Sequence, residues 1–328
     1  MKTKRPVLGH ICSAVGFVLL ALLLLLGAGA LLRPPQETYG STWRAYRAEP
    51  RNSIDVLYLG SSCAYCDIDP VEIYRHSGLT GYVMGGSEQT MSLTYWYLRQ
   101  CLETQTPQAV VFEATGVFFQ RYQSFTQPNI AYMPFTLNRL GAICTAAEPE
   151  LRPGLLLDLW FYHDRWKELS PPLLGPSDYK GYTPVEGTAE EIRPDPTSRQ
   201  LSQEQYQENL SWLLRSLELC RERGILAVVA VNPTYYRCDP EQYRRLGEDL
   251  SHAAPDVVFL NWSAAFADLG LEPEKHLYDK AHLNREGAAV FAKGLSDFLT
   301  GALDLVPMEQ TAPNRAAWDA LLTQRFAS

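Results

Sequence analysis

A serine, an aspartate and a histidine occur in this chain in an order and in contexts that suit acyl-transfer chemistry. Ser62 follows Gly60 and Ser61 directly after an aliphatic run, and Asp279 lies three residues before His282. A serine hydroxyl is a weak nucleophile until a base removes its proton, and the base works best when a third group fixes its orientation. A histidine has an unperturbed pKa of about 6.5, so one held by a carboxylate is a suitable base. Each motif alone is common, but the two together predict nucleophilic catalysis.

Cys63 and Cys66 offer a second chemistry at the same place, because they form a C-x-x-C sequence. A thioredoxin-like site needs a helix that starts at the first cysteine, whereas the strongest helix start here is Asp69, which precedes a proline. Neither a second cysteine pair nor a histidine pair at metal-ligand spacing accompanies them. We therefore expect no redox site, no metal and no cofactor. His276, six residues before His282, is interpreted as a surface histidine.

Five short aliphatic runs must position these residues. They are predicted as buried strands at 54–60, 81–85, 109–113, 225–232 and 257–261. Helical patterns separate them: capping boxes begin at Asp69 and Ser202, and Asn284 can cap a third helix. Aliphatic strands that alternate with helices predict an α/β fold of three layers, with a mostly parallel five-stranded sheet between helices, as in flavodoxin-like folds. In such a sheet the site forms at the carboxyl ends of the strands, where Ser62 falls.

Residues 116–200 interrupt this alternation with aromatic residues and prolines. We interpret them as one insertion over the carboxyl edge of the sheet that forms a lid or a substrate surface. His163 and Trp166 lie about one helical turn apart within it, and they either pack the insertion or stack on a sugar. The predicted boundaries are a stalk at 34–53, the α/β domain at 54–305 and a C-terminal helical tail at 306–328.

The first 33 residues carry the strongest signal for location. Residues 11–32 hold no charge over 22 positions, which at about 1.5 Å per residue is enough to cross a hydrocarbon core of about 30 Å. Lys2, Lys4 and Arg5 precede this stretch, so the amino terminus is predicted to stay in the cytoplasm and the rest to lie outside the cell membrane. A cleaved signal peptide is the alternative, because residues 28–30 resemble a cleavage site. Its apolar region is usually only about 7 to 15 residues long, so we expect an uncleaved anchor over 1–33.

The charge of the exported part argues against a nucleic-acid partner. The chain has 29 Lys and Arg, four of them in the first 33 residues, so 25 remain against 37 Asp and Glu. Phosphate binding needs a concentrated basic face, and no basic run of five residues exists. Six of the seven cysteines lie after the anchor, and the pattern leaves open whether they form disulfides or stay as buried thiols.

The two motifs, with a glycine between them in sequence, resemble those of the SGNH or GDSL-like hydrolases and acyltransferases. The similar segments are Gly60-Ser61-Ser62, Gly85 in VMGGSEQ, and Asp279-x-x-His282-Leu283-Asn284, and the resemblance covers roughly residues 54–300. Within that superfamily the chain is similar to membrane-anchored extracellular proteins of the DltD type and to the alginate and peptidoglycan O-acetyltransferases.

By this resemblance Ser62 is the nucleophile, His282 the general base and acid, and Asp279 the orienting carboxylate. The amides of Ser62 and Gly85 are implied to hold the developing oxyanion. The family adds a side-chain amide from an asparagine after the third strand, and this chain has none there. Thr115 is the candidate replacement donor, a structural hydroxyl being the alternative. Loss of one oxyanion donor typically costs about 10²- to 10³-fold in rate.

The resemblance and the anchor together predict an extracellular serine O-acyltransferase. An acyl group, acetyl or similarly small, would pass from an acyl donor through Ser62 to a cell-envelope polysaccharide. A multi-pass membrane-bound O-acyltransferase that exports the acyl group is a partner implied by the resemblance only. The alternatives are a carbohydrate esterase, if water is the acceptor, and a non-catalytic scaffold that binds glycan or the partner enzyme.

Overall fold

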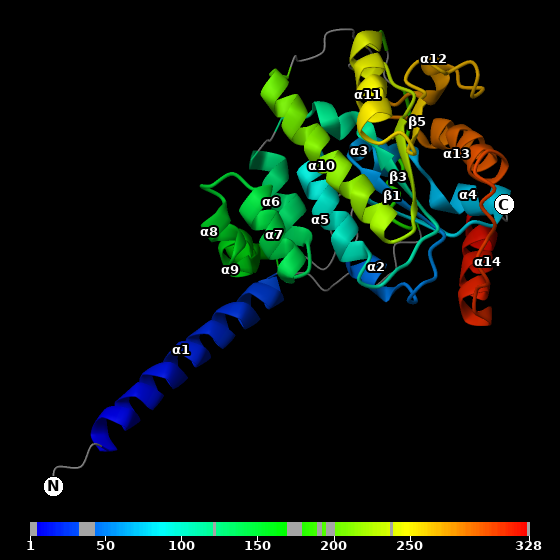
Figure 1. Cartoon of the computed structure of the whole chain (residues 1–328). Coiled ribbons are helices and arrows are strands. Elements are labelled where there is room, and N and C mark those ends of the chain that lie inside the picture. The colour runs from blue at the N-terminus through cyan, green and yellow to red at the C-terminus, as the bar shows by residue number, and fades with distance from the viewer. Residues whose placement is uncertain are drawn as a thin grey trace.

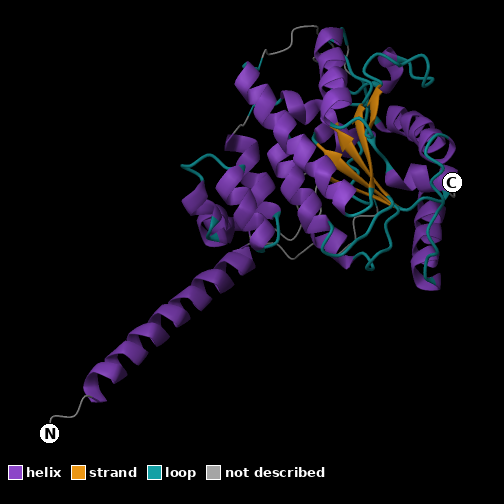
Figure 2. Ribbon diagram, viewed as in Figure 1, coloured by secondary structure: helices purple, strands orange, loops and turns teal. Residues whose placement is uncertain are grey.

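A five-stranded parallel sheet lies at the centre of the chain, with helices on both of its faces (Figure 2). The computed structural model describes residues 5–32, 43–120, 123–168, 179–188, 192–194, 201–236 and 239–326. The strand order is β2-β1-β3-β4-β5, and every neighbouring pair is parallel. The strands are β1 (Val56–Gly60), β2 (Gly81–Gly85), β3 (Ala109–Glu113), β4 (Leu226–Val231) and β5 (Val258–Asn261). Each falls within a predicted run, and the predicted three-layer fold class is confirmed.

Alternate strand residues face two separate apolar cores. Leu57, Leu59 and Phe112 belong to one core, which also takes side chains from α5 (Met91–Cys101), α10 (Gln203–Glu222) and α11 (Pro240–Ala253). Val56 and Val111 belong to the other, which is closed by α3 (Ser62–Asp67), α4 (Pro70–Ser77) and α13 (Arg285–Gly301). Because successive strand side chains point to opposite faces and both faces are covered, the strands have to be aliphatic throughout.

The predicted helix starts hold. The Asp69 carboxylate accepts hydrogen bonds from the Val71 and Glu72 amides at the start of α4. The Ser202 hydroxyl caps α10, and the Asn284 side chain caps α13. Such caps each contribute about 1 kcal/mol to helix stability.

Up to Glu168 the described part of the 116–200 segment is mostly helical, whereas 179–188 and 192–194 contain no helix or strand. Its elements are η1 (Ala114–Phe118), which begins just before it, then α6 (Gln123–Tyr132), α7 (Leu137–Thr145), α8 (Arg152–Leu155), α9 (Asp158–Tyr162) and η2 (His163–Glu168). Its first helices join the domain, because the Asn129 side chain donates to Ser87 O and Tyr97 donates its hydroxyl to Asn129 O. Most of 169–200 lies outside the described residues, and a lid role for this segment stays a prediction.

The two ends of the chain differ in how they meet the domain. α1 (Arg5–Leu32) projects from the domain as a single helix (Figure 1), and Gly9–Leu32 is long and apolar enough to cross a membrane. α2 (Trp43–Ala48) buries Trp43 and Tyr46, so the predicted stalk packs against the domain from Trp43 onward, while 33–42 lies outside the described residues. The predicted C-terminal helix is α14 (Ala312–Phe326), which buries Trp318 and contacts α4. A short helix, α12 (Pro273–His276), precedes α13.

Candidate active site

A short helix that the sequence did not predict presents Ser62. β1 ends at Gly60, and the Ser61 hydroxyl caps α3 by accepting the Cys63 amide at 3.2 Å. Ser62 is the first residue of α3 and is partly exposed. The N–H groups of a first helical turn have no acceptor within their own helix. The amide of Ser62 is therefore available to a ligand at the carboxyl edge of the sheet.

The same helix corrects the prediction that no helix starts at the C-x-x-C sequence. α3 begins at Ser62, directly before Cys63, so the case against a redox site has to rest on the thiols themselves. Burial raises the pKa of the Cys63 thiol, and the nearby carboxylates of Glu113 and Asp67 raise it further. Burial also raises the pKa of Cys66. A reactive thiol needs a lowered pKa, so this environment favours two packing thiols. The six described cysteines are all free.

Gly85 lies against the loop that carries Ser62. It pairs with Gly60 at the carboxyl ends of β2 and β1. A Cβ at position 85 would lie 2.8 Å from Gly60 O, closer than side-chain carbons approach backbone oxygens, and 3.0 Å from Ser61 O. A glycine is thus required for β2 to end this close to Ser61.

His282 is held by a tight loop between α12 and α13. Leu277 and Leu283 form an isolated antiparallel bridge, and the Tyr278 amide donates to His282 O at 2.9 Å. Within the loop, Asp279 Oδ1 accepts the amides of Ala281 and His282 at 2.7 and 2.9 Å. The D-x-x-H spacing therefore forms a closed turn, and the Asp279 carboxylate cannot rotate without losing two hydrogen bonds.

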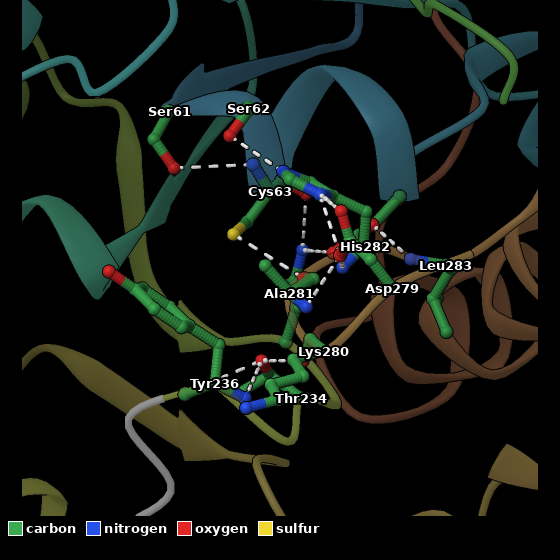
Figure 3. Close-up of polar contacts among 12 residues, drawn as sticks. Ser61, Ser62, Cys63, Thr234, Tyr236, Asp279, Lys280, Ala281, His282 and Leu283 are labelled. Carbon is green, nitrogen blue, oxygen red and sulfur yellow. Dashed lines mark hydrogen bonds and ion pairs between the residues drawn. The ribbon is translucent and has the colours of Figure 1, made fainter. Parts of the chain in front are cut away.

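The structure brings Ser62, His282 and Asp279 into one line of contacts (Figure 3). Ser62 Oγ lies 2.8 Å from His282 Nε2, although the two residues are 220 positions apart. His282 Nδ1 lies 3.0 Å from each carboxylate oxygen of Asp279. Both distances are within the reach of proton transfer and hydrogen bonding. The three residues thus have the mutual geometry of a nucleophile, a base and an orienting carboxylate.

The charges at this site favour an ionised Asp279 and a His282 that readily accepts a proton. Burial alone would lower the pKa of His282, but the hydrogen bond to Asp279 and the charges of Asp67, Asp279 and Glu113 together outweigh it and raise that pKa above its ordinary value. For Asp279, burial would raise the pKa, and the contact with His282 together with the two backbone amides lowers it. Asp279 is therefore ionised near neutral pH, where it stabilises a positive charge on the imidazole.

Asp67 and Asn232, which sequence reasoning missed, connect the two halves of the site. Asp67 is fully buried at the end of α3; its Oδ1 accepts the Leu283 amide at 2.8 Å, and its Oδ2 accepts from Asn232 at 3.2 Å. The Asn232 amide group also donates to Cys63 O. Because α3 carries Ser62 and Leu283 follows His282, these bonds fix the spacing of the two. The only sequence signal was Asn232 itself, a polar residue that ends an aliphatic run.

Glu113 and Thr115 support the loop from the other side. Glu113 is buried where β3 ends; its carboxylate accepts the Ser61 hydroxyl at 2.8 Å and the Thr115 amide at 2.8 Å. The Thr115 hydroxyl lies 3.2 Å from the Ser61 hydroxyl. The described hydrogen bond of the Thr115 hydroxyl is thus to Ser61, which agrees with a structural role for Thr115. Glu113 is the last residue of β3, the strand after which the SGNH-like pattern has an asparagine.

Two other predicted site residues lie elsewhere. His163 and Trp166 belong to η2, which contacts α1 and α9, and the structure does not bring them into contact with the Ser62, His282 and Asp279 group. His163 Nδ1 lies 2.9 Å from Trp160 O, and both side chains are largely exposed. His276 is also not the surface residue expected, because it is buried and its Nδ1 accepts the Glu272 amide.

Ten chains of solved structures resemble this chain, and two of them have weak overall likenesses. No family description and no curated protein matches the chain. A protein from Bacteroides fragilis described as an acylhydrolase is 13% identical, with a TM-score of 0.41 over 79% of this chain and 94% of its own. A GDSL-like lipase from Bacteroides thetaiotaomicron is 11% identical, with a TM-score of 0.39 over 79% of this chain and 96% of its own. At these identities and TM-scores, neither likeness identifies a family or an activity for this chain.

Proposed function

We propose that this chain is a serine enzyme that transfers an acyl group through an acyl-Ser62 intermediate. The observation that carries the proposal is the contact of Ser62 Oγ with His282 Nε2 at 2.8 Å, with Asp279 on the opposite ring nitrogen. These groups come from the first strand's end and from the loop before α13, so no local structure requires them to meet.

In the proposed reaction His282 Nε2 takes the proton of Ser62 Oγ as that oxygen attacks the acyl carbonyl carbon. The bond from this carbon to the leaving oxygen then breaks, and His282 returns the proton to that oxygen. In the second half, His282 removes the proton of an acceptor hydroxyl, whose oxygen attacks the acyl carbon. The bond from this carbon to Ser62 Oγ then breaks, and His282 returns the proton to Ser62. Asp279 stays ionised throughout and stabilises the imidazolium.

The oxyanion would be held by the amides of Ser62 and Gly85. Support comes from the start of α3 at Ser62 and from the close approach of Gly85 to Gly60 and Ser61. Thr115 binds Ser61, so it adds no third donor in this arrangement. A two-donor site is expected to run about 10²- to 10³-fold slower than one with a third donor.

We assign the reaction to the outer face of a membrane, with a hydroxyl of an envelope polysaccharide as the acceptor. This assignment is supported by the apolar helix α1, by the basic residues before it and by the resemblance of the motifs to anchored O-acetyltransferases. Gly29 and Leu32, three positions apart, are buried against the domain, so α1 is built into the fold at the place where a signal peptide would be cut.

The test is turnover of an aryl acetate by the full-length chain in detergent, with and without an added polysaccharide. We expect acetate on Ser62 by peptide mass spectrometry and, with the polysaccharide present, acetyl groups on its hydroxyls. Release to water alone, whatever acceptor is added, would indicate an esterase. If wild type shows no turnover above Ser62→Ala, the chain is a scaffold. Ser211→Ala, which removes an exposed hydroxyl on α10, is the matched control.

A further inference from the structure

An apolar surface on the 116–200 segment has no role in the proposed reaction. Outside α1, nine large hydrophobic side chains among the described residues are exposed, and six of them fall between 125 and 166: Phe125, Phe135, Leu137, Leu156, Trp160 and Trp166. Trp160 and Trp166 are 71% and 64% exposed, whereas Trp43, Trp212 and Trp318 are buried. Two largely exposed tryptophans only six positions apart are typical of a surface that binds a partner or a membrane.

The end of α1 lies beside these tryptophans. α9 and η2, which carry Trp160 and Trp166, both contact α1. Arg165 donates to Leu32 O at 2.9 Å, which satisfies a terminal carbonyl of α1. In Figure 1, α8 and α9 lie at the level where α1 meets the domain, and the sheet lies farther along the direction of α1. The surface is thus next to the point at which the anchor would leave the bilayer.

The length of α1 sets the depth of this surface. Gly9–Leu32 spans 24 residues, about 36 Å at about 1.5 Å per residue, against a hydrocarbon core of about 30 Å. A span that crosses this core therefore has its last turn within or near the headgroup region. Tryptophan is enriched at that level in membrane proteins, because its ring is apolar and its N–H can bond to headgroups.

We infer that the Trp160 and Trp166 surface rests in the outer headgroup region of the bilayer and so fixes the tilt of the domain on its anchor. This inference rests on the membrane anchoring proposed above. Charge plays a minor part, because the sequence from 152 to 168 has three basic and three acidic residues and so no net charge. Zwitterionic lipid is therefore a sufficient partner, in contrast to the basic surfaces that select anionic lipids.

The test is quenching of tryptophan fluorescence by brominated phosphatidylcholine in vesicles that hold the full-length chain. Bromines high on the acyl chain are expected to quench wild type more than bromines near the chain end. The variant Trp160→Phe/Trp166→Phe should lose most of this shallow quenching, each single variant should lose part of it, and Trp262→Phe, far from α1 in sequence and packed on Phe291 and Phe298, should retain it.

Retention of the chain on vesicles after alkaline washing tests the membrane anchoring separately from the position of the tryptophan surface. A chain that resists washing but is quenched no more than the double variant is anchored without a lipid-seated surface, which overturns the inference alone. If that chain also cross-links as a dimer through this surface, a second copy is the occupant. A chain that washes off contradicts the anchoring, and the inference with it.

Discussion

The carboxyl edge of the sheet and the Trp160 and Trp166 surface differ in how their side chains are held and in how far they are exposed. At the sheet edge the reactive groups are few and polar, and buried residues surround them. Asp67 and Glu113 are buried and hold the loops on either side of Ser62. On the other surface the rings of Trp160 and Trp166 are exposed, and the elements that carry them, α9 and η2, contact α1.

The difference is one of precision. The proposed proton transfer between Ser62 and His282 requires that their distance be held within a fraction of an ångström, so the sheet edge needs fixed hydrogen bonds. A bilayer interface has no fixed geometry, and contact with it depends on exposed apolar area. Substitutions at the two places should therefore differ in kind: rates change at the sheet edge, and lipid contact changes at the other surface.

The largest effect is expected from Ser62→Ala. It removes the proposed nucleophile while leaving the partly exposed start of α3 in place. Serine enzymes lose about 10⁴- to 10⁶-fold in rate on this change. Aryl acetate turnover measures it, and a variant that kept a tenth of the wild-type rate would contradict the role of Ser62.

Asp279→Asn should reduce kcat by about 10⁴-fold, because the amide no longer holds the required tautomer of His282. It also removes one of the carboxylates that raise the pKa of His282, the one hydrogen-bonded to its ring. For the residual activity, the midpoint of the rise in rate with pH should therefore move to lower pH. An unchanged midpoint would show that another group titrates.

Wild-type kcat/KM should rise with pH and level off only above pH 6.5. The base must be neutral to take the serine proton, and the pKa of His282 is raised, so the protonated, inactive form persists to higher pH than for a free histidine. A pH profile of aryl acetate turnover measures the midpoint. A midpoint well below 6.5 would mean that Asp279 does not act on His282 in solution.

Asp67→Asn tests whether the hydrogen bonds of buried Asp67 fix the distance between Ser62 and His282. The new amide can keep the Leu283 bond or face Asn232, whose own amide group donates, but cannot do both well. We expect about 1–3 kcal/mol less stability in urea unfolding and about 10²-fold lower kcat. Asp67→Asn/Asn232→Asp restores one donor and acceptor pair between the two positions and should recover part of the rate, which a purely destabilising change would not show.

The smallest effect on rate is expected at the other surface. Trp160→Ala should change aryl acetate turnover by less than about twofold, because substitutions at exposed positions away from a site have small effects. The same variant should lose lipid quenching. A fall in kcat of the size expected for Asp67→Asn would show that the two regions are coupled.

The sequence predicted the sheet because continuous aliphatic runs are typical of strands buried on both faces. The D-x-x-H spacing indicated the turn that carries Asp279 and His282, and the resemblance to SGNH-type sequences singled out Ser62 as their proposed partner. The start of α3 at Ser62 could not be predicted, because a six-residue helix has almost no periodicity and is stabilised by the Ser61 cap and by burial of its other residues.

The supporting residue Asp67 could not be predicted from the sequence for a different reason. Asp67 matters only because Leu283 and Asn232, both distant in sequence, meet it in space. Trp166 could not be assigned because a tryptophan suits both a sugar site and a membrane interface. The contact of η2 with α1 is what favours the membrane interface in our inference.

The most direct test of the central claim is labelling of the full-length chain with a fluorophosphonate, followed by peptide mass spectrometry. The proposed triad predicts one labelled residue, Ser62 and not its neighbour Ser61, with labelling lost in Ser62→Ala and His282→Ala and retained in Ser211→Ala. Wild type that labels no more than Ser62→Ala would contradict it.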